Sequence, residues 1–431
     1  MTATVRVPAA VRRRAAVFAG LAPRPRVLAA TAAGLLIVAA VHAFAGVPSL
    51  TGSGLVGAAL RLAVPVGLAA LGALWSERAG VTNLGLEGMM ILGTWSAAWV
   101  GASHGVWPAV LAGAAGGAIG GLVHAVATVT FGVDQVISGV AINLLTPGLV
   151  RYLSTINWEG LPEAGATQSP PVRGAIGTFT VPVLAGGHVG GRRSPDLLGA
   201  VERRDWFAVS DAAGLLRGLV AEISWFTLFA VVLFALSWLI LWRTPFGLRL
   251  RFIGENPGAA DSLGVAVYRT KYIAVVVSGA LAGLGGAFLV TVASGLYREG
   301  QTAGRGYIGL AAMIFGNWRP GGTAAGALLF GYSDALQLRQ SGAVRGLILA
   351  AGLAFLAIGV LLLRRRRRAS AVSLAAGAAA IAWFGLLHQV PTQLVYATPY
   401  AVTLIVLVAS ARRLRMPAAD GIPYRRGVID L

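Results

Sequence analysis

The sequence has no cysteine, few acidic residues and a single lysine. Without cysteine, the 431-residue chain can form no disulfide framework, thiolate nucleophile or Cys-ligated metal site. Lys271 stands in Thr-Lys-Tyr, whereas a phosphate-binding P-loop requires Gly-Lys followed by Ser or Thr. Any use of ATP must therefore come from a partner protein.

The histidines are too scattered to form a close-spaced metal-ligand or catalytic-triad pattern. They are His42, His104, His124, His188 and His388. Because nucleophile, base and metal-ligand patterns are all missing, we expect a protein that is not an enzyme and binds no cofactor.

Charged residues make up only 12% of the chain and hydrophobic residues 56%, with a mean hydropathy of +0.75. Continuous apolar runs occur at 27–46, 226–241, 272–293 and 347–363. A helix of roughly 20 residues crosses the hydrocarbon layer, and runs without alternation favour helices over barrel strands. The predicted fold class is an all-α polytopic membrane protein.

The net charge of +19 comes from arginines that lie between the apolar runs rather than in one basic domain. They cluster at 12–14, 249–251, 364–368, 412–415 and 425–426. This placement follows the positive-inside rule, so we expect contact with membrane lipid and not with nucleic acid. It also predicts that both termini are cytoplasmic.

The apolar runs and the arginines together predict about twelve spans. The predicted parts are a cytoplasmic N-terminus (1–26), a first membrane half (27–154), an external loop (155–221), a second membrane half (222–410) with a helix pair at 341–388, and a cytoplasmic tail (411–431). The basic N-terminus followed by 27–46 fits either a cleaved signal or, as we expect from its length, a retained signal-anchor helix. The external loop is either a small cap or an unstructured insertion.

Polar residues interrupt the apolar sequence at 76–90, where three glycines allow a helix to break. A carboxylate in a bilayer normally faces a bundle interior or an aqueous path, and transporters use broken helices to expose backbone groups. Asn83 and Glu87 are therefore candidates for the wall of a pathway. Alternatively, Glu87 pairs with an arginine and locks two helices together.

A second polar segment, at 254–264, lies between basic flanks on the predicted cytoplasmic face. Asn256 can cap a helix, Pro257 suits its first position and Gly264 suits its end. The pattern predicts a short helix outside the membrane. From spacing alone, this helix could dock a partner or be an ordinary solvated loop helix.

A third segment, at 304–320, predicts a half-helix or tilted hairpin that ends in a polar and aromatic turn containing Asn317. This polar end could line a path or anchor at the membrane interface. Glycines 113, 117 and 121, like 279 and 283, are four residues apart, a spacing that lets helix backbones approach closely. In so glycine-rich a chain, chance explains this spacing about as well.

These segments, in this order, resemble the permease family of ribose-type and branched-chain-amino-acid-type ABC importers, and most of all its nucleoside (guanosine) branch. Three further stretches share the resemblance: Asp134-Gln135-Val136-Ile137-Ser138-Gly139 running to Asn143, Gly331-Tyr332-Ser333-Asp334-Ala335-Leu336-Gln337, and Thr398-Pro399-Tyr400-Ala401-Val402-Thr403-Leu404. The pair at 341–388 departs from the family pattern, and the loop at 155–221 looks longer than usual.

The resemblance implies a permease subunit of the bacterial plasma (inner) membrane that imports nucleosides or a related small polar solute. Its implied partners are a cytoplasmic ABC ATPase, a second and non-identical permease subunit, and an extracytoplasmic solute-binding lipoprotein. The implied pathway residues are Asn83, Glu87, Asn143 and Asn317. The implied coupling helix, which docks the ATPase, contains Glu255, Asn256, Pro257, Ala260, Asp261 and Gly264.

The main alternative is a secondary transporter driven by protons or sodium. Such a transporter requires paired intramembrane carboxylates or a histidine relay. Only Glu87, Asp134 and Asp334 are candidates for that role. The sequence therefore favours the importer.

Overall fold

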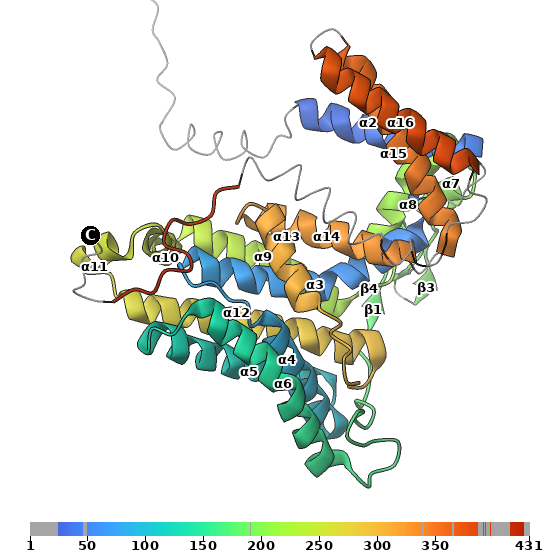
Figure 1. Cartoon of the computed structure of the whole chain (residues 1–431). Coiled ribbons are helices and arrows are strands. Elements are labelled where there is room, and N and C mark those ends of the chain that lie inside the picture. The colour runs from blue at the N-terminus through green and yellow to red at the C-terminus, as the bar shows by residue number, and fades with distance from the viewer. Residues whose placement is uncertain are drawn as a thin grey trace, which may run out of the picture. The chain divides into compact units, whose positions relative to one another are not determined.

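The computed structural model describes residues 25–45, 50–189, 191–337, 340–363, 366–386 and 414–425, together with residues 391, 393 and 397 (Figure 1). The chain forms two compact units. One contains 1–52, 198–215 and 341–391, and the other contains 53–197, 216–340 and 392–431. The predicted last span at 396–410 lies outside the described residues.

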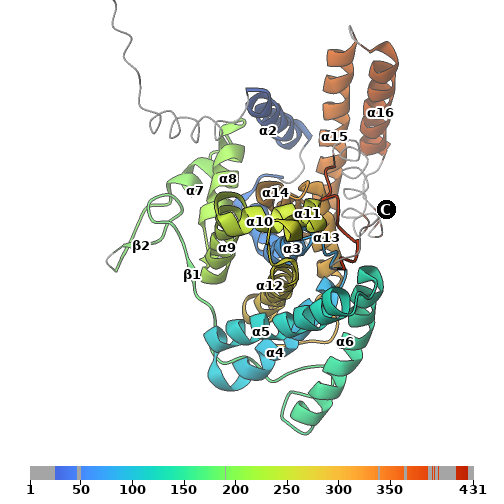
Figure 2. The ribbon, with the colours of Figure 1, turned by 90° about the vertical axis from the view of Figure 1, so that its left-hand side faces the viewer.

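The larger unit contains the helices that carry the predicted site. They are α3 (Ser53–Arg78), α4 (Leu86–His104), α5 (Val106–Ala125), α6 (Gln135–Trp158), α9 (Trp225–Arg243), α10 (Pro245–Glu255), α11 (Pro257–Ser262), α12 (Val267–Phe288), α13 (Arg305–Phe315) and α14 (Pro320–Gln337). Two π-helical turns, η1 (Val126–Thr130) and η2 (Leu289–Ser294), continue α5 and α12. Helix α12 lies between α3 and α5 in both views (Figures 1 and 2).

The smaller unit contains α2 (Pro25–Ala45) and an antiparallel hairpin of α15 (Gln340–Leu362) and α16 (Arg367–Leu386). The Ser370 hydroxyl donates a hydrogen bond to the Gly359 carbonyl across the hairpin, at 2.7 Å. Arg345 lies over the ring of Phe384, 4.8 Å from its centroid. The helix pair predicted at 341–388 is thus present.

The segment 155–221 contains short elements. They are β1 (Thr178–Phe179), β2 (His188–Val189), β3 (Arg192–Arg193), α7 (Leu197–Glu202) and α8 (Val209–Val220). Strand β1 pairs antiparallel with β4 (Ile223–Ser224), and β2 pairs antiparallel with β3. Helix α6 ends at Trp158, four residues after the predicted end of the first membrane half at 154.

Within the described residues, seven helical stretches are long and apolar enough to cross a membrane. They are 53–78, 106–130, 135–158, 225–243, 267–294, 344–362 and 367–386. Helices α4 and α14 are not among the seven. The all-helical membrane architecture is therefore confirmed, whereas a total of twelve spans stays a prediction.

Helices α5 and α12 touch backbone to backbone along the glycines that the sequence spaces four apart. A Cβ added at Gly117 would lie 2.2 Å from the Gly279 carbonyl oxygen, and one at Gly283 would lie 2.2 Å from the Gly113 oxygen. Only glycine permits such close contact between helices. The spacing is thus a packing feature, and it fixes α12 against the helices that surround the polar segment.

Candidate functional site

The polar segment predicted at 76–90 folds as a turn between α3 and α4. Helix α3 ends at Arg78, residues 79–85 are not helical, and α4 begins at Leu86. Gly80 has a φ of 73°, which other residues rarely adopt. The turn is buried, so its backbone groups require partners inside the protein.

Asn83 is fully buried in this turn and uses both ends of its amide. Its Nδ2 donates to the Ser278 Oγ of α12 at 2.9 Å, and its Oδ1 accepts from the Gly85 N–H at 3.1 Å. The side chain therefore shapes the turn and ties it to α12.

Glu87 and Asn143 hold the start of α4 from two sides. The Glu87 carboxylate accepts from the N–H groups of Gly304 at 2.9 Å and Gly306 at 2.7 Å, at the N-terminus of α13. A negative charge is stabilised there by the free N–H groups and the helix dipole. Asn143 of α6 accepts from the Gly88 N–H at 2.8 Å and donates to the Leu84 carbonyl at 2.7 Å. The structure thus brings Asn83, Glu87 and Asn143 together around one turn.

The turn has further partners that sequence reasoning missed. His124, buried in α5, contacts the Thr82 carbonyl at 3.1 Å and the Ser138 hydroxyl at 2.9 Å. The Gln135 Oε1 accepts from the Thr82 N–H at 2.6 Å. The only sequence signal for Gln135 and Ser138 is that they lie in the stretch beginning at Asp134.

Asn317 does not join the other three predicted pathway residues. It lies between α13 and α14 with a φ of 53°, and its Oδ1 accepts from the Arg415 N–H at 2.7 Å. The next residue, Trp318, is fixed to the end of α3: its indole N–H donates to Glu77 at 2.6 Å, and its carbonyl accepts from the Arg78 guanidinium at 2.6 and 2.9 Å. This turn therefore belongs to the Arg78 end of α3.

The segment predicted at 254–264 forms the short helix α11 directly after α10. The Asn256 Oδ1 accepts from the Ala259 N–H at 2.9 Å, Pro257 occupies the first turn, and Gly264 has a φ of 78°. The predicted capping is confirmed. Ala260 is fully buried with Ile253, while Glu255 is exposed beside the chain end and Asp261 is partly exposed.

Helix α10 meets the α3–α4 turn through backbone contact. A Cβ added at Gly254 would lie 2.3 Å from the Arg78 carbonyl oxygen, and one at Gly80 would lie 3.3 Å from the Gly254 Cα and 3.1 Å from the Ala419 oxygen. Helix α10, the α3–α4 turn and the segment around Ala419 therefore meet here, although they are far apart in the sequence. We call this last segment, residues 414–425, the C-terminal strap; it is shown in dark red beside α10 and α11 in Figure 1.

The strap places a carboxylate in the junction. Asp420 is 8% exposed, and it accepts from the Thr82 hydroxyl at 3.1 Å. Burial raises the pKa of this carboxyl from 3.8 to about 6, although interactions with Glu77, Thr82 and Lys271 lower it. Lys271 of α12 donates to the Gly80 carbonyl at 3.2 Å. Charged groups from three segments thus converge where the helices meet.

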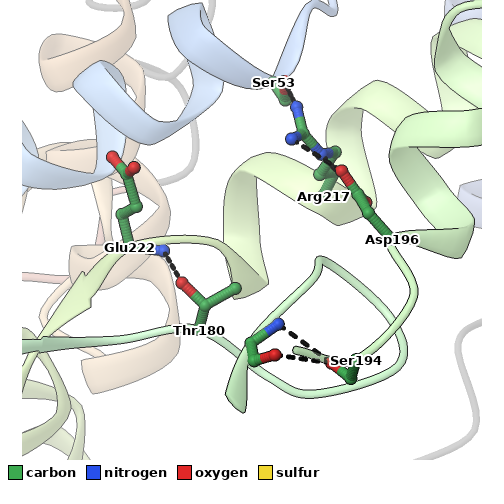
Figure 3. A network of polar contacts seen from close by, with 7 residues as sticks. Ser53, Thr180, Ser194, Asp196, Arg217 and Glu222 are labelled. Atoms are coloured by element: carbon green, nitrogen blue, oxygen red, sulfur yellow. Dashed lines mark hydrogen bonds and ion pairs between the residues drawn. The ribbon is translucent and has the colours of Figure 1, made fainter. Parts of the chain in front are cut away.

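A second polar network orders the segment around α8 (Figure 3). The Arg217 guanidinium donates to Ser53 at 2.9 Å and forms an ion pair with Asp196 at 2.9 Å. The Glu222 N–H donates to the Thr180 hydroxyl at 3.0 Å. A cavity of about 160 Å³ lies beside Arg217 between the starts of α3 and α9, and Glu222 is also in its lining. Within the described residues, no group of three or more His, Asp or Glu residues could hold a metal ion.

Comparison with known proteins identifies the family. Residues 55–351 match the permease component of branched-chain amino acid transport systems. The guanosine ABC transporter permease NupQ of Bacillus subtilis is 30% identical over 381 residues, which cover 86% of this chain and 97% of the relative. The nucleoside ABC transporter permease NupC of Lactococcus lactis is 30% identical over 372 residues, which cover 85% of this chain and 94% of the relative.

A putative glucose ABC transporter permease of Haloferax volcanii, TsgC13, is 36% identical over 290 residues, which cover 67% of this chain and 78% of the relative. No solved structure matches the chain. These relatives are transport components rather than enzymes, and the apolar helices agree with that role. The chain therefore belongs to the permease-component family of branched-chain amino acid transport systems, as a multi-pass membrane subunit of an ABC importer.

Proposed function

We propose that this permease forms the membrane path for a nucleoside. The observation that carries the proposal is the similarity over at least 85% of the chain to two permeases named for guanosine and nucleosides. A buried polar turn within apolar helices supports it, because polar groups at that depth are costly unless they are functional or fully paired.

The path runs along the nonhelical turn that separates α3 from α4. Asn83, Glu87 and Asn143 form its wall and hold the nonhelical backbone in place, since each bonds to backbone or side-chain groups around the turn. Because these side chains have partners inside the protein, they contact a passing solute weakly. Weak contact suits a conduit that must release what it receives.

Helix α11 is the coupling helix that docks a separate ABC ATPase. Its capped start at Asn256 and Pro257 and its glycine end at Gly264 make it a rigid knob after α10. Ala260 anchors it from below, and Glu255 and Asp261 flank the docking surface. A push on α11 reaches the path through the contact between Gly254 and Arg78.

The remaining partners complete the importer. A second, non-identical permease subunit encloses the path, and a solute-binding lipoprotein delivers the solute outside. The chain lies in the bacterial plasma membrane with about twelve spans and both termini in the cytoplasm. This orientation places α11 and the strap on the same side, in agreement with the bond from the Ala419 N–H to the Gly254 carbonyl.

Uptake of radiolabelled guanosine tests this function in cells that express the importer genes with or without the permease. We expect uptake that depends on ATP and resists a protonophore. The double change Glu255→Arg, Asp261→Arg should abolish it and prevent copurification of the ATPase. Glu159→Gln, an exposed carboxylate after α6, is the matched control and should leave uptake unchanged. Uptake that survives ATP depletion but collapses with the protonophore would identify a secondary transporter instead.

Competition identifies the solute class. Unlabelled adenosine and cytidine should reduce guanosine uptake, whereas glucose and leucine should not. Inhibition by glucose alone would move the assignment toward the solute named for the Haloferax volcanii relative.

A further inference from the structure

The C-terminal strap bonds to each of the segments that meet at the end of α3. The Arg415 N–H donates to Asn317, the Ala418 N–H to the Glu255 carboxylate at 3.4 Å, and the Ala419 N–H to the Gly254 carbonyl at 2.9 Å. Asp420 accepts from Thr82 in the α3–α4 turn at 3.1 Å. Over six residues the strap therefore links the α10–α11 loop, the α3–α4 turn and the α13–α14 turn.

The strap is built into the fold rather than resting on its surface. Ala419 and Asp420 are only 7% and 8% exposed. Burying a carboxylate is costly unless it has partners, and here Thr82 donates to it and the charge of Lys271 stabilises it. The ring of Tyr424 packs on that of Tyr268 at the start of α12, with centroids 5.7 Å apart.

The direct contact between α10 and the α3–α4 turn can transmit movement only when the two are pushed together. The Gly254 backbone presses on the carbonyl of Arg78, and a steric contact transmits a push but not a pull. Hydrogen bonds, by contrast, resist separation. The strap holds Gly254 on one side and Thr82 on the other, so it makes the junction resist tension as well as compression.

We propose that the strap carries the movement of the α10–α11 loop to the α3–α4 turn, with Asp420 as the positioning residue. This inference rests on the proposed docking of the ATPase at α11. The strap matters most when the α10–α11 loop moves away from the α3–α4 turn, because the turn must then follow the loop. Without it, ATP hydrolysis and the movement of the turn become independent.

The test uses the copurified complex of the permease with its ATPase and partner subunit in proteoliposomes supplied with the binding protein. ATP hydrolysis and guanosine uptake are measured together. Asp420→Ala should lower uptake per ATP hydrolysed by about tenfold, the scale of a typical coupling energy, and leave hydrolysis within about twofold. Asp420→Asn keeps an acceptor for Thr82 and removes only a charge that burial disfavours, so it should retain most of the parent coupling. Equal loss of hydrolysis and uptake would show that Asp420 serves folding only.

A double-mutant cycle separates coupling from folding. Thr82→Val removes the donor to Asp420 without changing the size of the side chain. If the two residues act as one link, Thr82→Val combined with Asp420→Ala should lower uptake per ATP no further than the worse single change. Additive losses would overturn the assignment.

A second measurement does not depend on the solute. Because the chain has no cysteine, Leu84→Cys provides a unique maleimide reporter in the turn. ATP with vanadate should change its labelling rate in the parent complex, and Asp420→Ala should remove that change. A labelling rate that does not change with ATP in the parent complex, or that changes equally in Asp420→Ala, would overturn the proposed role of the strap. A complex that shows the labelling response but no guanosine uptake would instead refute the nucleoside assignment alone.

Discussion

Gly254 of α10 lies against Arg78 of α3 so closely that a Cβ at 254 would be 2.3 Å from the Arg78 carbonyl oxygen. The contact is backbone to backbone, so no flexible side chain can yield to an added methyl group. We expect Gly254→Ala to separate α10 from the turn and to lower transport by about tenfold.

Uptake and ATP hydrolysis measured in proteoliposomes check this expectation. Gly321→Ala in α14 is the matched control, because a Cβ there would meet no atom within 4 Å. If both alanines transport alike, the contact at Gly254 has no role in transport.

Glu87 provides a second prediction, on stability. Its two oxygens accept from two N–H groups of α13, and a hydrogen bond to a charged group contributes about 1.5–3 kcal/mol. Glu87→Ala should lower the free energy of unfolding by about 3 kcal/mol, and Glu87→Gln by less, because the amide oxygen still accepts. Thermal unfolding in detergent measures both. Glu163→Gln, at an exposed position, is the control and should not shift the unfolding temperature. An equal shift in all three variants would contradict a stabilising contact between Glu87 and the N-terminus of α13.

The glycine contact between α5 and α12 gives a third prediction. Gly117→Val places side-chain atoms where the Gly279 carbonyl lies 2.2 Å away, so overpacking should cost about 3 kcal/mol or more. The yield of folded, monodisperse protein should fall sharply. Gly148→Val in α6 meets no atom within 4 Å at its Cβ and should retain the parent yield.

The strap should dock more firmly at low pH. The pKa of Asp420 is about 6 in the folded protein and 3.8 in a free chain, so the docked state binds the proton more tightly. Docking therefore weakens as pH rises from about 4 to 6, by about 3 kcal/mol, and stays at its weaker value above pH 6. Glu77 and Lys271 face the same carboxyl and take part in this titration.

Hydrogen exchange of residues 414–425 measures the effect after correction for intrinsic rates. Protection should be greater at pH 5 than at pH 7.5 in the parent, and the difference should largely disappear in Asp420→Asn. A parent profile that is flat with pH, or one that rises toward pH 7.5, contradicts the prediction.

The local features of α11 were predictable because helix capping depends only on residues next to the helix ends. Asn256, Pro257 and Gly264 each act within one turn of helix, and the structure confirms the capping. The glycine spacing on α5 and α12 was equally readable, although the sequence could not show that the two sets face each other. That pairing depends on how α5 and α12 pack.

The site was only partly predictable, because its contacts join distant residues. Thr82 and Asp420 are 338 positions apart, and no local pattern marks a carboxylate in an arginine-rich tail as buried. The partners of Glu87 are backbone groups 217 and 219 positions away. The sequence therefore offered a pathway wall or a pairing with an arginine, and it did not indicate a helix end. Asn317 stays a predicted pathway residue, and its bond to Arg415, 98 positions away, could not be read from any local pattern.

Helices α5 and α12 meet through glycine, with no side chain between the backbones of Gly117 and Gly279. Where backbones touch, no change of rotamer can let the helices slide past each other, so we expect this pair to move as a single piece. Movement during transport should then occur along faces built from longer side chains. Helix α6 has such a face, with Leu144 and Leu145 72–75% exposed. We therefore predict that a hinge of the permease lies around α6, beyond Asn143.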